Sequence, residues 1–146
     1  MNLSKPNNPL PGLPAGYGSV RKRKQTARIY PDRYHLILRE AVKRCGLRYW
    51  EEVEVWNPLG GGEKQRGYGA YQWLDFVVRL PAGGIGAIDF PSPTANNPKR
   101  EARYINEKKA LLIGRGIPYL VLAPPRTTAA AEVHIRRWLK QLERKR

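Results

Sequence analysis

The chain has 146 residues, enough for one domain with a hydrophobic core, and its 27 Lys and Arg against 12 Asp and Glu give a net charge of +15. This charge predicts a polyanionic partner, most commonly nucleic acid, while a hydrophobic content of 41% excludes a wholly disordered basic chain. The single Cys excludes an internal disulfide and a cysteine-based zinc site, and no stretch is apolar enough to span a membrane. We therefore expect a soluble intracellular protein of the cytoplasm or nucleoid, or of the nucleus in a eukaryote.

Residues 1–28 are predicted to form an extended or disordered basic arm that precedes a single α/β domain at residues 29–146. Prolines and glycines disfavour a helix in the arm, which has six basic and no acidic residues. Its basic cluster consists of Arg21, Lys22, Arg23 and Lys24. The cluster is either a solvated run of charges, such as a nuclear import signal, or a segment that contacts a phosphate backbone. We expect it to contact a phosphate backbone.

The first helix is predicted to begin at Pro31-Asp32 and to end at Gly46. Its apolar residues repeat at helical spacing: Tyr34, Ile37, Leu38, Ala41, Val42 and Cys45. Glu40 falls on the polar flank of this helix. His35 has no partner that the sequence identifies, so we expect a surface or packing residue. Residues 49–56 alternate between apolar and charged positions, which predicts a strand.

A Gly-rich loop at residues 57–69 separates this strand from a predicted hairpin. The loop lacks the Gly-Lys-Ser/Thr ending of a nucleotide-binding P-loop, and we expect Lys64 and Arg66 to contact a phosphate backbone instead. Residues 71–80 alternate as a strand, a Pro-Ala-Gly-Gly turn follows, and residues 85–90 return as the second strand of the hairpin.

The rest of the chain predicts helix, strand and helix. Pro98 begins a helix that Gly116 ends, and the wholly apolar residues 119–123 are typical of a strand buried on both faces. Thr127 or Thr128 caps the last helix. Three basic residues recur along that helix at four-residue spacing and form a predicted backbone-contacting ridge: Arg136, Lys140 and Arg144.

The predicted order is therefore helix, strand, strand, strand, helix, strand, helix, or αβββαβα. Three consecutive strands form an antiparallel meander, and the following helix returns the chain to a parallel strand. Such an order is typical of an α/β fold in which a mixed sheet carries helices on its faces.

Two aspartates are predicted to lie close together on the hairpin. Asp75 lies six residues before the turn and Asp89 five residues after it, which places them opposite or diagonal to each other. Like charges are destabilising there, and a bound Mg²⁺ would explain them because carboxylate oxygens suit that ion. The alternatives are salt bridges to Arg79, Arg103 or Lys109, or a register that leaves one aspartate on a wet edge.

This layout resembles the PD-(D/E)xK nuclease superfamily, with Asp75 on the second strand and Asp89 on the third. The segment Ala87-Ile88-Asp89-Phe90, the charged helix after it and residues 116–122 look most like the small members of that superfamily. Among these are the very-short-patch-repair-like and the phage- or transposon-borne nucleases. The resemblance covers residues 32–123 and implies a restriction-endonuclease-like mixed sheet.

The resemblance also implies roles for the matching residues. Asp75 would be the first metal ligand, Asp89 the acidic residue of the second half-motif, and Glu40 an additional acidic residue of the metal shell. Pro91 stands where the family has its lysine, and in some relatives the following helix supplies that charge. The helix here offers Lys99, Lys108 and Lys109. Lys109 falls at helical spacing from Ala102, Ile105, Leu112 and Ile113, so we expect Lys109 to face the sheet, either in the catalytic role or as a snorkelling side chain.

The leading hypothesis is thus an enzyme, a Mg²⁺- or Mn²⁺-dependent endonuclease that hydrolyses phosphodiester bonds through Asp75 and Asp89. The alternative is a non-catalytic nucleic-acid-binding protein, either a degenerate nuclease fold or a structural subunit of a nucleoprotein assembly. The missing lysine favours the alternative, whereas the acidic pair favours the enzyme. The expected partner is nucleic acid, DNA rather than RNA, with a second copy of the chain or a larger nucleoprotein assembly, and no membrane.

Overall fold

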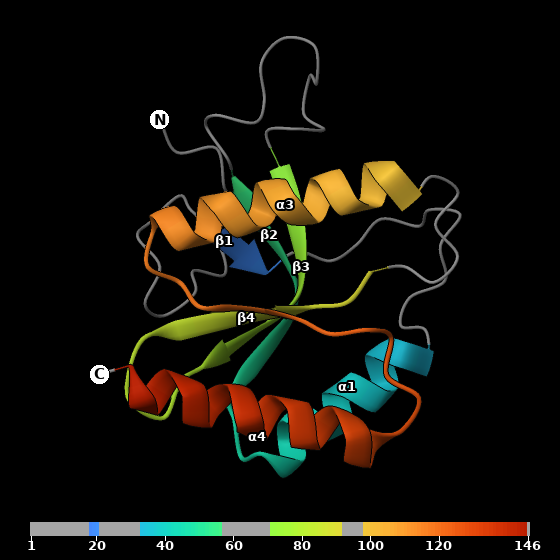
Figure 1. Cartoon of the computed structure of the whole chain (residues 1–146), viewed down its shortest axis with the longest axis vertical. Coiled ribbons are helices and arrows are strands. Elements are labelled where there is room, and N and C mark those ends of the chain that lie inside the picture. The colour runs from blue at the N-terminus through green and yellow to red at the C-terminus, as the bar shows by residue number, and fades with distance from the viewer. Residues whose placement is uncertain (1–17, 21–32, 57–70, 92–97, 146) are drawn as a thin grey trace, which may run out of the picture.

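The computed structural model describes residues 18–20, 33–56, 71–91 and 98–145. Their elements are β1 (Gly18–Val20), α1 (Arg33–Arg44), β2 (Tyr49–Trp56), β3 (Tyr71–Arg79), β4 (Ile85–Asp89), α3 (Pro98–Gly114), β5 (Tyr119–Val121) and α4 (Thr128–Arg144). Figure 1 shows the sheet between two helical layers, with α3 on one face and α1 and α4 on the other. Over the described residues the predicted mixed α/β class is therefore confirmed. No helix among them is long and apolar enough to cross a membrane.

The described strands form one mixed sheet in the order β1-β2-β3-β4-β5. β2, β3 and β4 pair as an antiparallel meander, and β5 returns parallel to β4 after α3, as predicted. The strand β1 was not predicted, because its residues fall in the arm at 1–28. Its extended backbone pairs with the outer edge of β2, where unpaired amides and carbonyls accept another strand.

The prediction that residues 119–123 are buried on both faces is wrong. The strand β5 is half-buried, and its last residue, Val121, is exposed. Its position at the edge of the sheet is the reason, because only one of its sides pairs with another strand in the described part of the chain.

The predicted helix ends are found. Gly46 has φ of 71° and Gly116 has φ of 70°, in the left-handed region that favours glycine. After each glycine, the next N–H donates to a carbonyl five residues back, at 3.4 Å for Leu47 and 2.9 Å for Ile117, which closes the helix in a Schellman motif. At the start of α4 the hydroxyl of Thr127 accepts the Ala130 N–H at 3.1 Å.

The sheet separates two hydrophobic clusters. The cluster under α1 and α4 contains Leu38, Val42, Phe76, Ile88, Ile135 and Trp138, among others. The cluster under α3 contains Val53, Leu74, Val77, Ala87 and Leu112, among others. Close packing of α4 on β4 requires Gly86, since a Cβ there would lie 2.6 Å from the ring of Trp138.

The side chains of β2 and β3 stop alternating strictly between the two faces of the sheet near the middle of the paired strands. In β3, Phe76 packs under α1 and α4, whereas Leu74 packs under α3, although both should share one face. In β2, Tyr49 and Val53 are divided between the two clusters in the same way. Strict alternation along β3 was predicted, and that prediction is wrong at this point.

The break in alternation coincides with Glu52 and Asp75. The backbone pairs on either side, 51 with 76 and 53 with 74, place these two residues directly opposite each other. Glu52 has φ of 50°, which is rare for a residue other than glycine and rotates its neighbours onto new faces. Such backbone strain in a buried strand is common at functional sites.

Candidate active site

Asp75 and Asp89 lie opposite each other at the point where β3 and β4 stop pairing through their backbones. The last backbone pair joins Phe76 and Ile88, and the same register sets Asp75 against Asp89. The Asp75 N–H donates to Asp89 Oδ1 at 2.6 Å, and the Phe90 N–H donates to Asp75 Oδ2 at 3.1 Å. The expected proximity of the aspartates is found, with carboxylate oxygens replacing carbonyls as the acceptors of both amides.

Asp89 is the buried centre of this group, with 0% of its surface exposed. Its Oδ2 accepts the Tyr119 hydroxyl at 2.5 Å and lies 2.7 Å from Lys108 Nζ. Burial raises the pKa of Asp89 above its usual range, although the Lys108 ammonium opposes that rise. Burial also disfavours charge on Lys108, but the nearby carboxylates outweigh burial and raise its pKa. Lys108 therefore keeps its positive charge.

The lysine at the site is Lys108, and the prediction that Lys109 faces the sheet is wrong. Lys109 and Ile113 are exposed, whereas Leu112 is buried. The predicted stripe counted Ile113 as a buried position. With Ile113 exposed, the inward line passes through Ile105, Lys108 and Leu112, at helical steps of three and four.

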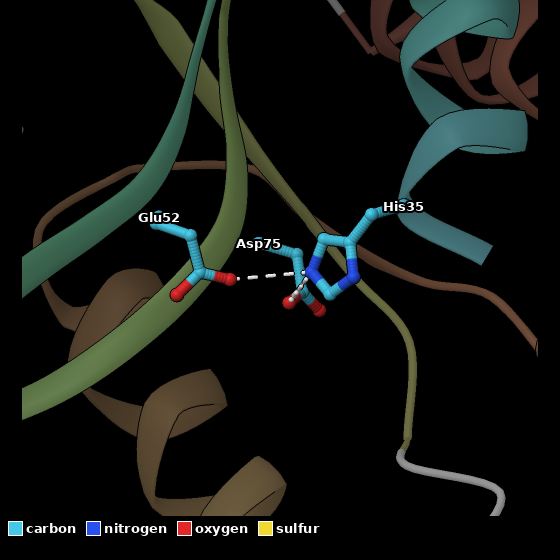
Figure 2. Close-up of side chains that lie close together, drawn as sticks. All are labelled: His35, Glu52 and Asp75. Atoms are coloured by element: carbon cyan, nitrogen blue, oxygen red, sulfur yellow. Dashed lines mark hydrogen bonds and ion pairs between the residues drawn. The ribbon is translucent and has the colours of Figure 1, made fainter. Parts of the chain in front are cut away.

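A second group adjoins the aspartates on the α1 side of the sheet. Figure 2 shows His35 of α1, Glu52 of β2 and Asp75 of β3 pointing toward one another. His35 Nε2 lies 2.9 Å from Asp75 Oδ1 and 3.2 Å from Glu52 Oε1. One ligand atom of each residue lies within 4.8 Å of the other two, so the group could hold one metal ion. We call these three residues the histidine–carboxylate cluster.

Three residues of the site had no functional prediction: His35, Glu52 and Tyr119. For His35 a signal was present, because it precedes Leu38 by three residues on the buried stripe of α1, where a polar residue is unusual. Its imidazole is fully buried, and its ring meets that of Phe90 edge-on with the centroids 4.9 Å apart. Glu52 and Tyr119 gave no such signal. The alternating pattern of apolar and charged residues in its strand grouped Glu52 with the exposed charged residues.

The structure does not bring Glu40 to the site. Glu40 is exposed on α1, and its carboxylate lies 4.0 Å from Arg44 of the next turn. Five residues separate His35 from Glu40, a rotation of about 140° around a helix, so the two side chains leave α1 in different directions.

The predicted basic ridge lies on the outer face of α4. Arg136, Lys140 and Arg144 are exposed there and line a shallow depression together with Arg137. Arg136 also donates to Glu132 at 2.8 Å and to the Arg44 carbonyl at 2.9 Å, which ties α4 to α1. The other predicted contacts lie outside the described residues: Arg21, Lys22, Arg23, Lys24, Lys64 and Arg66.

Comparison of the chain with protein-family models, with curated proteins and with solved structures gives no match. A function for this protein is therefore inferred from its residues and their geometry.

Proposed function

We propose that this protein is a metal-dependent phosphodiester hydrolase that acts on nucleic acid, built on a restriction-endonuclease-like sheet of the PD-(D/E)xK kind. One observation carries the proposal. Two aspartates lie opposite each other on neighbouring antiparallel strands, and the Lys108 ammonium lies 2.7 Å from the second, Asp89. Lys108 of α3 thus supplies the positive charge that Pro91 cannot.

The accessible groups of the site suit this chemistry. The side chains of Asp75 and Lys108 are 14% and 15% exposed, whereas Asp89 between them is closed to solvent. Asp75 offers a carboxylate to a divalent ion, and Lys108 offers a fixed positive charge to a phosphate oxygen. Asp89 orients both, through the Asp75 amide and the Lys108 ammonium. A divalent ion held at Asp75 would activate a water molecule and offset charge on the phosphate, in the role of Mg²⁺ or Mn²⁺.

Cleavage of supercoiled plasmid and of branched DNA tests the proposal. In Mg²⁺ or Mn²⁺ we expect the wild-type protein to cut. We expect Asp75→Asn to lose at least about 100-fold in rate, because asparagine keeps the shape of aspartate but removes the negative charge that binds the ion. Glu143→Gln, an exposed change on α4, is the matched control and should cut like the wild type. Equal cutting by all three proteins would point to a contaminating nuclease. Salt-sensitive DNA binding without cutting in either ion would establish the non-catalytic binding protein instead.

Exposed basic residues of α4 are the proposed contact to the nucleic-acid backbone. We expect the triple substitution of Arg137, Lys140 and Arg144 by Gln to weaken binding to duplex DNA, measured without divalent ions. Affinity falls as salt rises, and each lost phosphate contact should make the slope of log affinity against log salt less steep by about 0.9. Loss of all three contacts should make it less steep by about 2.7. Lys109→Gln, an exposed change on α3, is the control and should leave the slope unchanged. An unchanged slope in the triple variant would place the contact surface elsewhere.

A further inference from the structure

We propose that the histidine–carboxylate cluster of His35, Glu52 and Asp75 is a binding site for a first-row transition-metal ion and that it prefers Mn²⁺ to Mg²⁺. The inference deepens the proposed function, on which it rests for the use of the ion in catalysis. It differs from the site expected from the sequence, in which Asp75 and Asp89 share the ion.

The distances fit ligands of one ion. Two ligand atoms that lie about 2.1 Å from an ion and at right angles to each other are about 3 Å apart. His35 Nε2 lies 2.9 Å from Asp75 Oδ1 and 3.2 Å from Glu52 Oε1. Since the three side chains come from α1, β2 and β3, the packed fold holds them together without a loop (Figure 2).

The donor set favours a transition metal over Mg²⁺. Mg²⁺ is bound mainly by carboxylates and water, whereas imidazole nitrogen suits Zn²⁺, Cu²⁺, Fe²⁺ and Ni²⁺; Mn²⁺ begins the same first-row series, with the lowest affinity of its members. His35 is fully buried and Glu52 is 3% exposed, so an ion there would exchange water for protein ligands, which Mg²⁺ does reluctantly. Two carboxylates also balance the charge of a divalent ion. The more exposed Asp75 leaves one side of the site open to solvent.

Asp89 is a poor ligand for this ion. Its two oxygens already accept the Asp75 N–H, the Tyr119 hydroxyl and the Lys108 ammonium. A cation bound at Asp89 would lie beside the charge of Lys108 and be repelled. The ion is therefore placed on the α1 side of Asp75, and Asp89 acts as a positioning residue that fixes the Asp75 backbone and Lys108.

Titration of the metal-free protein with Mn²⁺ alone tests the site, with the free aqueous ion followed by electron paramagnetic resonance. We expect one Mn²⁺ per chain and at least tenfold weaker binding in His35→Gln and in Glu52→Gln. His134→Gln, on the exposed face of α4, is the matched control. In Asp89→Asn, verified as folded by circular dichroism, binding should weaken less than in His35→Gln or Glu52→Gln, because Asp89 positions Asp75 but is not itself a ligand.

The competing explanation is a His35 whose Nε2–H donates to both carboxylates, for which the same distances would be found. It predicts no tight Mn²⁺ binding by the folded wild-type protein, and that result would overturn the proposal. Loss of binding in Asp89→Asn but not in His35→Gln would also overturn it, in favour of the two-aspartate site. If Mg²⁺ displaces Mn²⁺ at equal concentration, the proposed selectivity is wrong.

The metal titration contains no nucleic acid, so its failure is separate from failure of the proposed function. One Mn²⁺ bound through His35, without any DNA cleavage, would keep the metal site and reject the nuclease. Cleavage that requires Asp75 but is unchanged in His35→Gln and Glu52→Gln would support the nuclease function and contradict this set of metal ligands.

Discussion

Replacement of Lys108 by methionine is expected to slow metal-dependent DNA cleavage by about 100- to 1,000-fold, the usual effect of removing one fixed group that stabilises the transition state. Methionine keeps the length and apolar stem of lysine but removes the charge that lies 2.7 Å from Asp89. The same substitution at Lys109, the exposed next residue of α3, should leave the rate unchanged. The initial rate of plasmid nicking measures both.

The pair of variants separates a catalytic charge from a general loss of positive charge. Lys108→Met and Lys109→Met lower the net charge equally, so a nonspecific electrostatic contribution would slow both by similar amounts. Circular dichroism melts identify any loss of folded protein, and rates are compared below the lower melting temperature. A fast Lys108→Met variant, or an equally slow Lys109→Met variant, would remove Lys108 from the proposed mechanism.

The difference between these two lysines also shows which part of the site the sequence could predict. Local signals predicted most element ends, because Gly46, Gly116 and Thr127 each act on hydrogen bonds within a few residues. The pairing of Asp75 with Asp89 was predictable for the same reason, since a short turn fixes the register of a hairpin.

What could not be predicted depends on tertiary packing. The choice between Lys108 and Lys109 is a rotation of α3 by one residue, about 100°, and depends on how the helix meets the sheet. Glu52 enters the site because its backbone leaves the ordinary strand conformation, against the alternating pattern of β2. Local preference and global fold disagree most at this position, as they often do at functional sites.

Replacement of Asp89 by alanine is expected to lower the free energy of unfolding by about 3–5 kcal/mol, the cost of removing one partner of a buried ion pair. Asp89 has 0% of its surface exposed, and its loss would leave the Lys108 ammonium and the Tyr119 hydroxyl without their shared acceptor. The Asp75 amide would lose its acceptor as well. Urea denaturation of the wild-type protein and of the variant measures the change.

A double-mutant cycle then tests whether the charge of Lys108 causes most of that loss. In Asp89→Ala combined with Lys108→Met no buried ammonium remains, so the double variant should be more stable than Asp89→Ala alone by about 1–3 kcal/mol. The matched double variant with Lys109→Met should gain nothing. If Lys108→Met fails to restore stability, the ammonium reaches water once Asp89 is gone, and Asp89 would stabilise the fold through the Tyr119 hydroxyl and the Asp75 amide instead.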